Sequence, residues 1–288
     1  MISVKVEIQI TVHQYAKLIM IIEETFEVIK ARYGQRMNTV TIENLVAGIY
    51  LTSVKLSSGY SGLASNDLNS PDSCTHSRSR GFGDFTPGKF KGQRVADLFA
   101  IPDPSCFIRT VQLAVMNALS AELLGESPYR IIENLDPIEL INLSEAKQVC
   151  VVGAFLSYIK KIADSNSVLK IIELNQSAIP EEYRQYFVPV QLAKDVLLKS
   201  DVIIITGSSL ANNTLDELLE IIPRKSRVML VGPTSGLIPD VLFARGVDII
   251  GATRITDGDT MQELVAEGAA GFHLFNSCAM KICLVNES

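Results

Sequence analysis

The chain has no long run of basic residues, and its formal net charge at pH 7 is -6 over 288 residues. A nucleic-acid surface needs clustered Lys and Arg side chains that replace the counterions of the phosphates. We therefore expect no nucleic-acid partner. The expected partner is a small-molecule ligand, and the sequence leaves a homo-oligomer open.

Cysteines are few and scattered, at Cys74, Cys106, Cys150, Cys278 and Cys283. Their number is odd and two of them lie in apolar, strand-like runs, so no disulfide framework is visible. This pattern fits a reducing compartment, and we expect a cytoplasmic protein.

Long apolar runs are also missing, because no stretch reaches the roughly 18 uncharged apolar residues of a membrane helix. Glutamates interrupt the apolar patch near Ile19, and no signal-peptide n-region or cleavage site precedes it. We expect neither export by such a signal nor membrane anchoring.

Common catalytic motifs are absent. The sequence contains no G-x-G-x-x-G after a strand, no P-loop and no G-x-S-x-G elbow. These absences argue against a dinucleotide dehydrogenase and a nucleoside triphosphatase. They also leave the catalytic residues unknown, so the sequence does not decide whether the protein turns over a substrate.

Hydrophobic residues make up 47% of the chain, enough to build one large or two modest cores. In the first part, helical spacing predicts helices over Val12–Arg32 and Phe107–Leu124, and residues 39–64 read as an antiparallel meander. Residues 65–91 hold many turn formers and predict a long loop, either a lid or simply solvated. A proline-rich linker places the boundary near Asn142, between domains 1–141 and 142–288.

The second part alternates apolar strands with amphipathic helices. Continuous Val- and Ile-rich strands bounded by helices are typical of a parallel sheet that is covered on both faces. We therefore predict an α/β protein with a smaller N-terminal α+β domain and a C-terminal Rossmann-like, doubly wound, mostly parallel sheet.

Ligands of such sheets bind beyond the carboxyl ends of the strands. The strand ends are rich in glycine and short polar side chains, which let a ligand approach the backbone and offer it hydrogen bonds. Asn117, on a helix of the first domain, is expected opposite. The predicted ligand-binding residues are Gly153, Phe155, Glu173, Thr206, Gly207, Ser208, Asn213, Thr214, Gly232, Pro233, Thr234, Ser235, Asp257 and Asn117.

Each assignment has a plainer alternative. Thr214 with Glu217 predicts a capping box at a helix start. Glu173 lies about 20 residues after Gly153, the spacing of an acid that binds ribose hydroxyls, but it could equally be a solvated strand end. Glu173, Asp257 and Asp259 are the strand-end candidates for acid or base chemistry, and the loop adds His76, Arg78, Arg80 and Asp84.

Cys74 and His76 are the candidate metal ligands. A thiol and an imidazole two residues apart suit a divalent transition metal such as zinc or copper. Two ligands do not make a site, and a solvated pair without metal is the favoured alternative.

The stretches TGSSLANNTLDELL and GPTSGLIPDVLFARGVDIIGA resemble a family called “Putative heavy-metal chelation”, domain of unknown function 364. GIYLTSVKLSSGYSGLAS and LAVMNALSAELL resemble the small domain that precedes it, which is similar in fold to the enolase N-terminal domain. The resemblance covers nearly the whole chain. It implies a site between the two domains and a role in metal handling, or in condensing or hydrolysing pterin-, flavin- or siderophore-like molecules. The family's usual Gly-x-Phe-Pro stands here as Gly153-Ala154-Phe155-Leu156.

Three hypotheses follow. The leading one is a protein that binds a small, polar, anionic or heteroaromatic metabolite between its domains. The second is a metal or metallophore carrier without turnover, and the third is a methyltransferase-like enzyme that uses S-adenosylmethionine, suggested by Glu173 alone.

Overall fold

Runs of Val and Ile form the larger of two sheets, because β-branched side chains pack well on a pleated surface. The structure is a computed structural model and describes residues 20–66, 85–126 and 129–287. The strands of this sheet are β4 Ile131–Glu133, β5 Gln148–Val152, β6 Val168–Ile172, β7 Phe187–Val188, β8 Val202–Thr206, β9 Arg227–Val231, β10 Ile249–Ile255 and β11 Ala279–Val285.

The strand order of this sheet is β4-β11-β10-β9-β8-β5-β6-β7. The strands from β7 to β10 are parallel to one another, as the sequence predicts. Within this parallel part β5 comes first along the chain, and β6 and β8 pair with it on opposite sides. This is the order of a doubly wound nucleotide-binding sheet, and its switch point lies between β5 and β8.

Two antiparallel strands complete the other edge. β11 pairs with β10 and β4 pairs with β11. Strand β4 comes from the segment that links the two halves, so the linker is itself part of the larger sheet. Gly251 on β10 makes room for this linker, because a Cβ there would lie 2.2 Å from Cγ of Pro137.

Helices follow most of the parallel strands. They are α4 Leu156–Ala163, α5 Ala193–Leu197, α6 Ser208–Ala211, α7 Leu215–Ile221, α8 Asp240–Ala244, α9 Gly258–Ala266 and α10 Gly271–Leu274. On one face of the sheet α4 buries Ile159 and Ile162 in a core cluster with β5 and β8. On the other face Leu215 of α7 and Leu242 of α8 join a core that continues into the N-terminal part.

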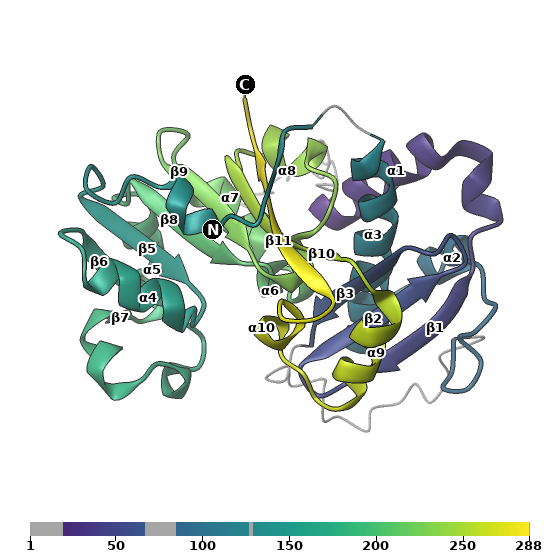
Figure 1. Ribbon diagram of the computed structural model, residues 1–288. Helices are drawn as coiled ribbons and strands as arrows, with labels where there is room; N and C mark the ends of the chain where they lie inside the picture. The colour runs from purple at the N-terminus through teal and green to yellow at the C-terminus, as the bar shows by residue number, and fades with distance from the viewer. Residues whose placement is uncertain (1–19, 67–84, 127–128, 288) are drawn as a thin grey trace, which may run out of the picture.

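The N-terminal part is a three-stranded antiparallel sheet with helices, as predicted. Its strands are β1 Ile42–Ala47, β2 Leu51–Leu56 and β3 Ser61–Ser65, in that order, and its helices are α1 Ile21–Tyr33, α2 Val95–Phe99 and α3 Cys106–Gly125. Figure 1 shows this sheet beside the larger one, with α3 and α9 lying against it. Gly62 of β3 allows close packing, because a Cβ there would lie 2.3 Å from the backbone of α3.

Helix α3 is long and apolar enough to cross a membrane by length and composition, but 83% of its apolar window is buried inside the protein. It is therefore packed as a core helix. The predicted helix over Val12–Arg32 is observed from Ile21 to Tyr33, and residues 1–19 lie outside the described part of the chain.

The predicted capping box at Thr214 is wrong. Helix α7 does begin after Thr214, but the Thr214 side chain makes no capping hydrogen bond. Its hydroxyl donates instead to Oδ1 of Asn212, at 2.7 Å. The reason is that α6 occupies the turn, so Thr214 has αR rather than extended backbone angles and its side chain points back into the turn.

Candidate functional site

Three glycines meet at the carboxyl edge of the parallel sheet. A Cβ on Gly153 would lie 2.9 Å from Cγ2 of Thr206, and one on Gly232 would lie 3.5 Å from the backbone nitrogen of Gly207. The Gly207 amide also donates to the carbonyl of Val231, at 2.7 Å. The structure thus brings together the ends of β5, β8 and β9.

Two of these positions require glycine. Gly153 has φ 108° and Gly232 has φ 136°, a region that side chains strongly disfavour. At these angles the backbone turns sharply as it leaves β5 and β9. The polypeptide can therefore run flat along the edge of the sheet, where a ligand could approach it.

Phe155 lies over this edge. A Cβ on Gly232 would be 3.7 Å from Cζ of Phe155, and the half-buried ring stacks on Tyr158 with centroids 5.5 Å apart and planes at 21°. Helix α4 begins directly after Phe155. The amides of Tyr158 and Ile159 donate to the carbonyl of Phe155, so the helix leaves only the amides of Leu156 and Ser157 without acceptors at this edge. The edge therefore offers an aromatic face beside backbone donors.

Tyr158 is fixed by residues that the sequence analysis did not single out. Its hydroxyl donates to Oδ1 of Asp136 at 2.7 Å, and Nζ of Lys281 donates to the other carboxylate oxygen at 2.8 Å. Burial alone would raise the pKa of Asp136, but these two hydrogen bonds outweigh it and hold that pKa below its usual value. Burial and Asp136 together raise the pKa of Tyr158. No local motif marks this chain of contacts, because it joins the linker, α4 and β11.

Thr234, Ser235 and Asn117 do come together, but they bind the protein itself. Thr234 and Ser235 are completely buried in the 3-10 turn η7, Pro233–Ser235. The hydroxyl of Thr234 accepts from the amide of Ser65, and Ser235 donates to the carbonyl of Gly251. Nδ2 of Asn117 donates to the carbonyls of Leu63, Pro233 and Thr234. This cluster joins η7 to β3 and α3.

A small cavity lies where the two parts meet. It has about 20 Å³ of space, room for roughly one water molecule, between β3, α3, η7 and β10. Asn117 is one of its lining residues, and Oδ1 of Asn117 has no hydrogen-bond partner. In the described residues, then, the region between the domains is nearly filled at this point.

The polar turn after β8 is ordered by its own side chains. Oγ1 of Thr206 accepts from the amide of Ser208, at 3.3 Å, and Asn213 has the left-handed φ of 57°. Ser208, Asn213 and Thr214 are all partly exposed. Of these, Ser208 is next to Gly207 in the chain, whereas Asn213 and Thr214 follow α6.

The strand-end acids occupy three different positions. Glu173 lies just beyond β6, and one of its oxygens accepts from the amide of Asn175 at 2.9 Å. Asp257 caps α9, and the hydroxyl and amide of Thr260 hold the pKa of Asp257 below its usual value. Asp259 binds Lys55 of the small sheet, at 2.7 Å. Only Glu173 belongs to a strand next to β5.

The described residues do not fit a resident metal. They contain no group of three or more His, Cys, Asp or Glu side chains arranged to hold one. Burial raises the pKa of the Cys150 thiol to about 12 and that of Cys283 to about 11, which disfavours the thiolate that binds metals. Cys74 and His76 lie outside the described residues, as do Arg78, Arg80 and Asp84 of the predicted lid.

Residues 136–284 match the family described as “Putative heavy-metal chelation”, domain of unknown function 364. The chain belongs to this family. A second family with the same description, domain of unknown function 4213, matches residues 30–120. The resemblance noted in the sequence is therefore confirmed, while neither match names a substrate.

Solved structures show the same fold. A protein of unknown function from Pyrococcus horikoshii, of the same family, is 17% identical with a TM-score of 0.73, over 93% of this chain and 100% of that one. Another member from Desulfitobacterium hafniense is 22% identical with a TM-score of 0.65, over 91% and 99%. An uncharacterized protein of Methanocaldococcus jannaschii is 26% identical over 178 residues, and the match spans 57% of this chain and 60% of that protein.

Proposed function

We propose that the protein binds a small metabolite with a planar ring and an anionic group at the carboxyl edge of β5, β8 and β9. The ring would stack on Phe155, and the anion would bind the first backbone N–H groups of α4. Gly153, Gly207 and Gly232 would let the ligand approach the backbone, and Thr206, Ser208 and Glu173 would supply hydrogen bonds.

The observation that carries this proposal is the meeting of Gly153, Gly207, Gly232 and Phe155 at the switch point of a doubly wound sheet. At a switch point the loops after neighbouring strands leave toward opposite faces, which opens space for a ligand. Two of these glycines adopt backbone angles that a side chain would strain. Such angles are consistent with a backbone shaped for close approach.

Chemistry at this edge would be acid/base-assisted hydrolysis or condensation, with Glu173 as the acid or base. The same carboxylate carries the alternative of S-adenosylmethionine binding, since its second oxygen is free to accept from a ribose hydroxyl. Asp257 and Asp259 serve α9 and Lys55 instead, so we assign them no role in binding the ligand.

Thermal-shift measurements with flavin mononucleotide, a pterin and S-adenosylmethionine test the proposal. A compound at one hundred times its dissociation constant should stabilise the protein by about 2.7 kcal/mol. We expect Phe155→Ala to remove the shift of a ring-containing compound and Leu174→Ala, at an exposed neighbouring position, to keep it. A shift that survives Phe155→Ala unchanged would place the ligand elsewhere.

Metal handling is the second candidate, and the family description favours it. The candidate ligands remain Cys74 and His76, with a divalent transition metal. Elemental analysis of protein purified without a metal-binding tag should find stoichiometric metal that a Cys74→Ser, His76→Ala double variant loses. Protein that stays metal-free after loading with zinc and with copper would exclude a carrier.

A further inference from the structure

Helix α9 rests on the outer face of the small sheet, and its apolar contact there begins at Met261. Met261 and Val265 are completely buried in a cluster with Leu51 and Leu63. A Cβ on Gly48 would lie 2.3 Å from the carbonyl oxygen of Val265, so helix and sheet touch closely at this end.

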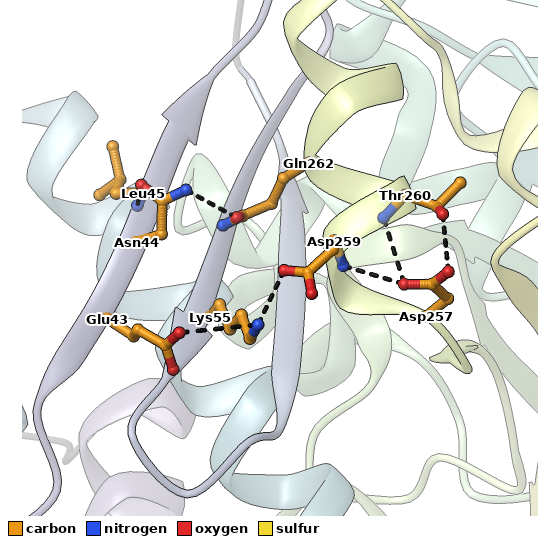
Figure 2. A network of polar contacts seen from close by, with 8 residues as sticks. All are labelled: Glu43, Asn44, Leu45, Lys55, Asp257, Asp259, Thr260 and Gln262. Carbon is orange, nitrogen blue, oxygen red and sulfur yellow. Dashed lines mark hydrogen bonds and ion pairs between the residues drawn. The ribbon is translucent and has the colours of Figure 1, made fainter.

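The N-terminal half of α9 lies over polar side chains instead. Asn44, Lys55 and Ser61 form one row across the sheet, because Lys55 pairs in register with both others. Lys55 binds Asp259 at 2.7 Å and reaches Glu43 at 3.6 Å, while Asn44 donates to Oε1 of Gln262 at 2.8 Å. Figure 2 shows these contacts crossing from the strands to the helix.

Three buried polar atoms at this contact have no partner among the described residues. They are Oγ of Ser53, Oγ of Ser61 and Nε2 of Gln262. The orientation of Gln262 is set by a chain of hydrogen bonds, since the Leu45 amide binds Oδ1 of Asn44 and leaves its Nδ2 to donate to Gln262. Ser53 pairs in register with Val46 and Leu63 of the apolar cluster, whereas Ser61 lies directly under Gly258, in the first turn of α9.

Unpaired buried polar groups destabilise the closed contact, because each has lost its hydrogen bonds to water. The direct bonds that oppose opening are few, and Asp259 in the Lys55 ion pair is largely exposed, at 74% of its side chain. Such exposed ion pairs contribute little. The polar end of this contact is therefore much weaker than the apolar end.

We propose that the first turn of α9 parts from the small sheet while Met261 and Val265 stay docked. Water then pairs with Ser61. The moving segment is the turn at Asp257 with residues Gly258 to Thr260, and the apolar cluster around Met261 and Val265 is the fixed end.

This motion also uncovers the cavity between the two parts. Ser61 touches Gly258 and lines that cavity together with Asn117 and Thr253. When Gly258 moves away, the cavity opens to water beside Ser61. The motion of α9 does not depend on the proposed function.

Hydrogen exchange of the backbone amides, followed on the full chain without added ligand, tests the motion. A freed helical turn does not keep its hydrogen bonds in water. The amide of Met261 donates to the carbonyl of Asp257 in that turn, so it loses its acceptor when the turn parts. We expect Met261 and Gln262 to exchange faster than Val265 and much faster than the centre of α3.

Three variants test whether exchange in α9 speeds up or slows down as the proposal requires. Lys55→Met removes the ion pair and should speed exchange at Met261 and Gln262 by about two- to fivefold, as 1 M NaCl should in the wild type. Ser61→Ala removes the unpaired hydroxyl under Gly258 and should slow the same amides by at least about twofold. Lys30→Met, which breaks a comparable exposed ion pair with Glu27 on α1, should leave α9 unchanged.

The proposal is overturned if Met261 and Gln262 exchange as slowly as α3, or if Ser61→Ala speeds their exchange. It is equally overturned if Lys55→Met and Lys30→Met change α9 alike. A failure of all compounds in the thermal-shift panel would affect the binding proposal and leave these amide rates untouched, so the two proposals fail separately.

Discussion

The two parts of the molecule meet at two junctions of opposite character. At the first, η7 packs against α3 and β3, and its Thr234 and Ser235 are fully buried. Asn117 Nδ2, Thr234 and Ser120 bind backbone groups across the boundary. At the second, α9 lies on the small sheet and leaves three buried polar atoms unpaired beside an exposed ion pair.

The difference shows where rigidity is needed. η7 follows β9 directly, so the first junction fixes the strand end that carries Gly232 and keeps the carboxyl edge in shape. Helix α9 follows β10, farther from the switch point, where a loose contact leaves β5 and β8 undisturbed. The proposed ligand edge is thus held by the first junction, and the second lies away from it.

Gly62→Ala should break the tight junction most severely. Its Cβ would lie 2.3 Å from the carbonyl oxygen of Ala114 and from the amide nitrogen of Ala118, so β3 and α3 must separate. We expect a loss of about 3 kcal/mol or more in the free energy of unfolding, measured with urea. Gly125→Ala, at the end of α3 with nothing within 4 Å, is the control and should change it by less than about 1 kcal/mol.

Asn117→Ala should cause the next largest loss in the free energy of unfolding. It removes the donor shared by three buried carbonyls, those of Leu63, Pro233 and Thr234. The expected loss is about 2 to 4 kcal/mol, because the carbonyls stay buried without a partner. Urea denaturation of Asn166→Ala, at an exposed position, provides the baseline. Equal stability of the two variants would show that η7 is not held by Asn117.

The linker contact should depend on pH. The pKa of Asp136 is lower in the folded protein than the unfolded value of about 4, so its stabilisation is present above that value and is lost as the pH falls through the folded pKa. We therefore expect Asp136→Asn to be less stable than the wild type at pH 6 and the gap to shrink below pH about 4. Denaturant titrations at pH 6, 4 and 3 measure this, and a constant gap would contradict it.

Lys55→Met should give the smallest change in global stability. One partner of the ion pair is highly exposed. We therefore expect the free energy of unfolding, measured with urea, to fall by less than about 1 kcal/mol. The same variant should nevertheless speed exchange in α9. A global loss as large as that of Asn117→Ala would mean that the α9 junction is as tight as the η7 junction.

The sequence predicted what depends on local periodicity. The Val and Ile runs gave the parallel strands, and helical spacing gave α3. The meeting of Gly153, Gly207 and Gly232 also followed, because parallel strands end at a common edge. These patterns are short-range or follow from one general rule of sheet architecture.

Contacts made across the chain were not predictable. Thr234 and Ser235 have the same residue types as exposed site residues, and only the packing of η7 on α3 shows that they are structural. The capping box failed because α6 fills the turn before Thr214. The Asp136–Tyr158–Lys281 contact and the docking of α9 join distant segments, so no local spacing encodes them.

Hydrogen exchange of the wild-type protein at single-amide resolution tests the contrast between the junctions most directly. The account predicts that the amides of Ser65 in β3 and of Ala118 in α3 exchange only on global unfolding, while Met261 and Gln262 in α9 exchange well before it. The same slow, global exchange at all four amides would contradict it, and so would faster exchange at Ser65 than at Met261.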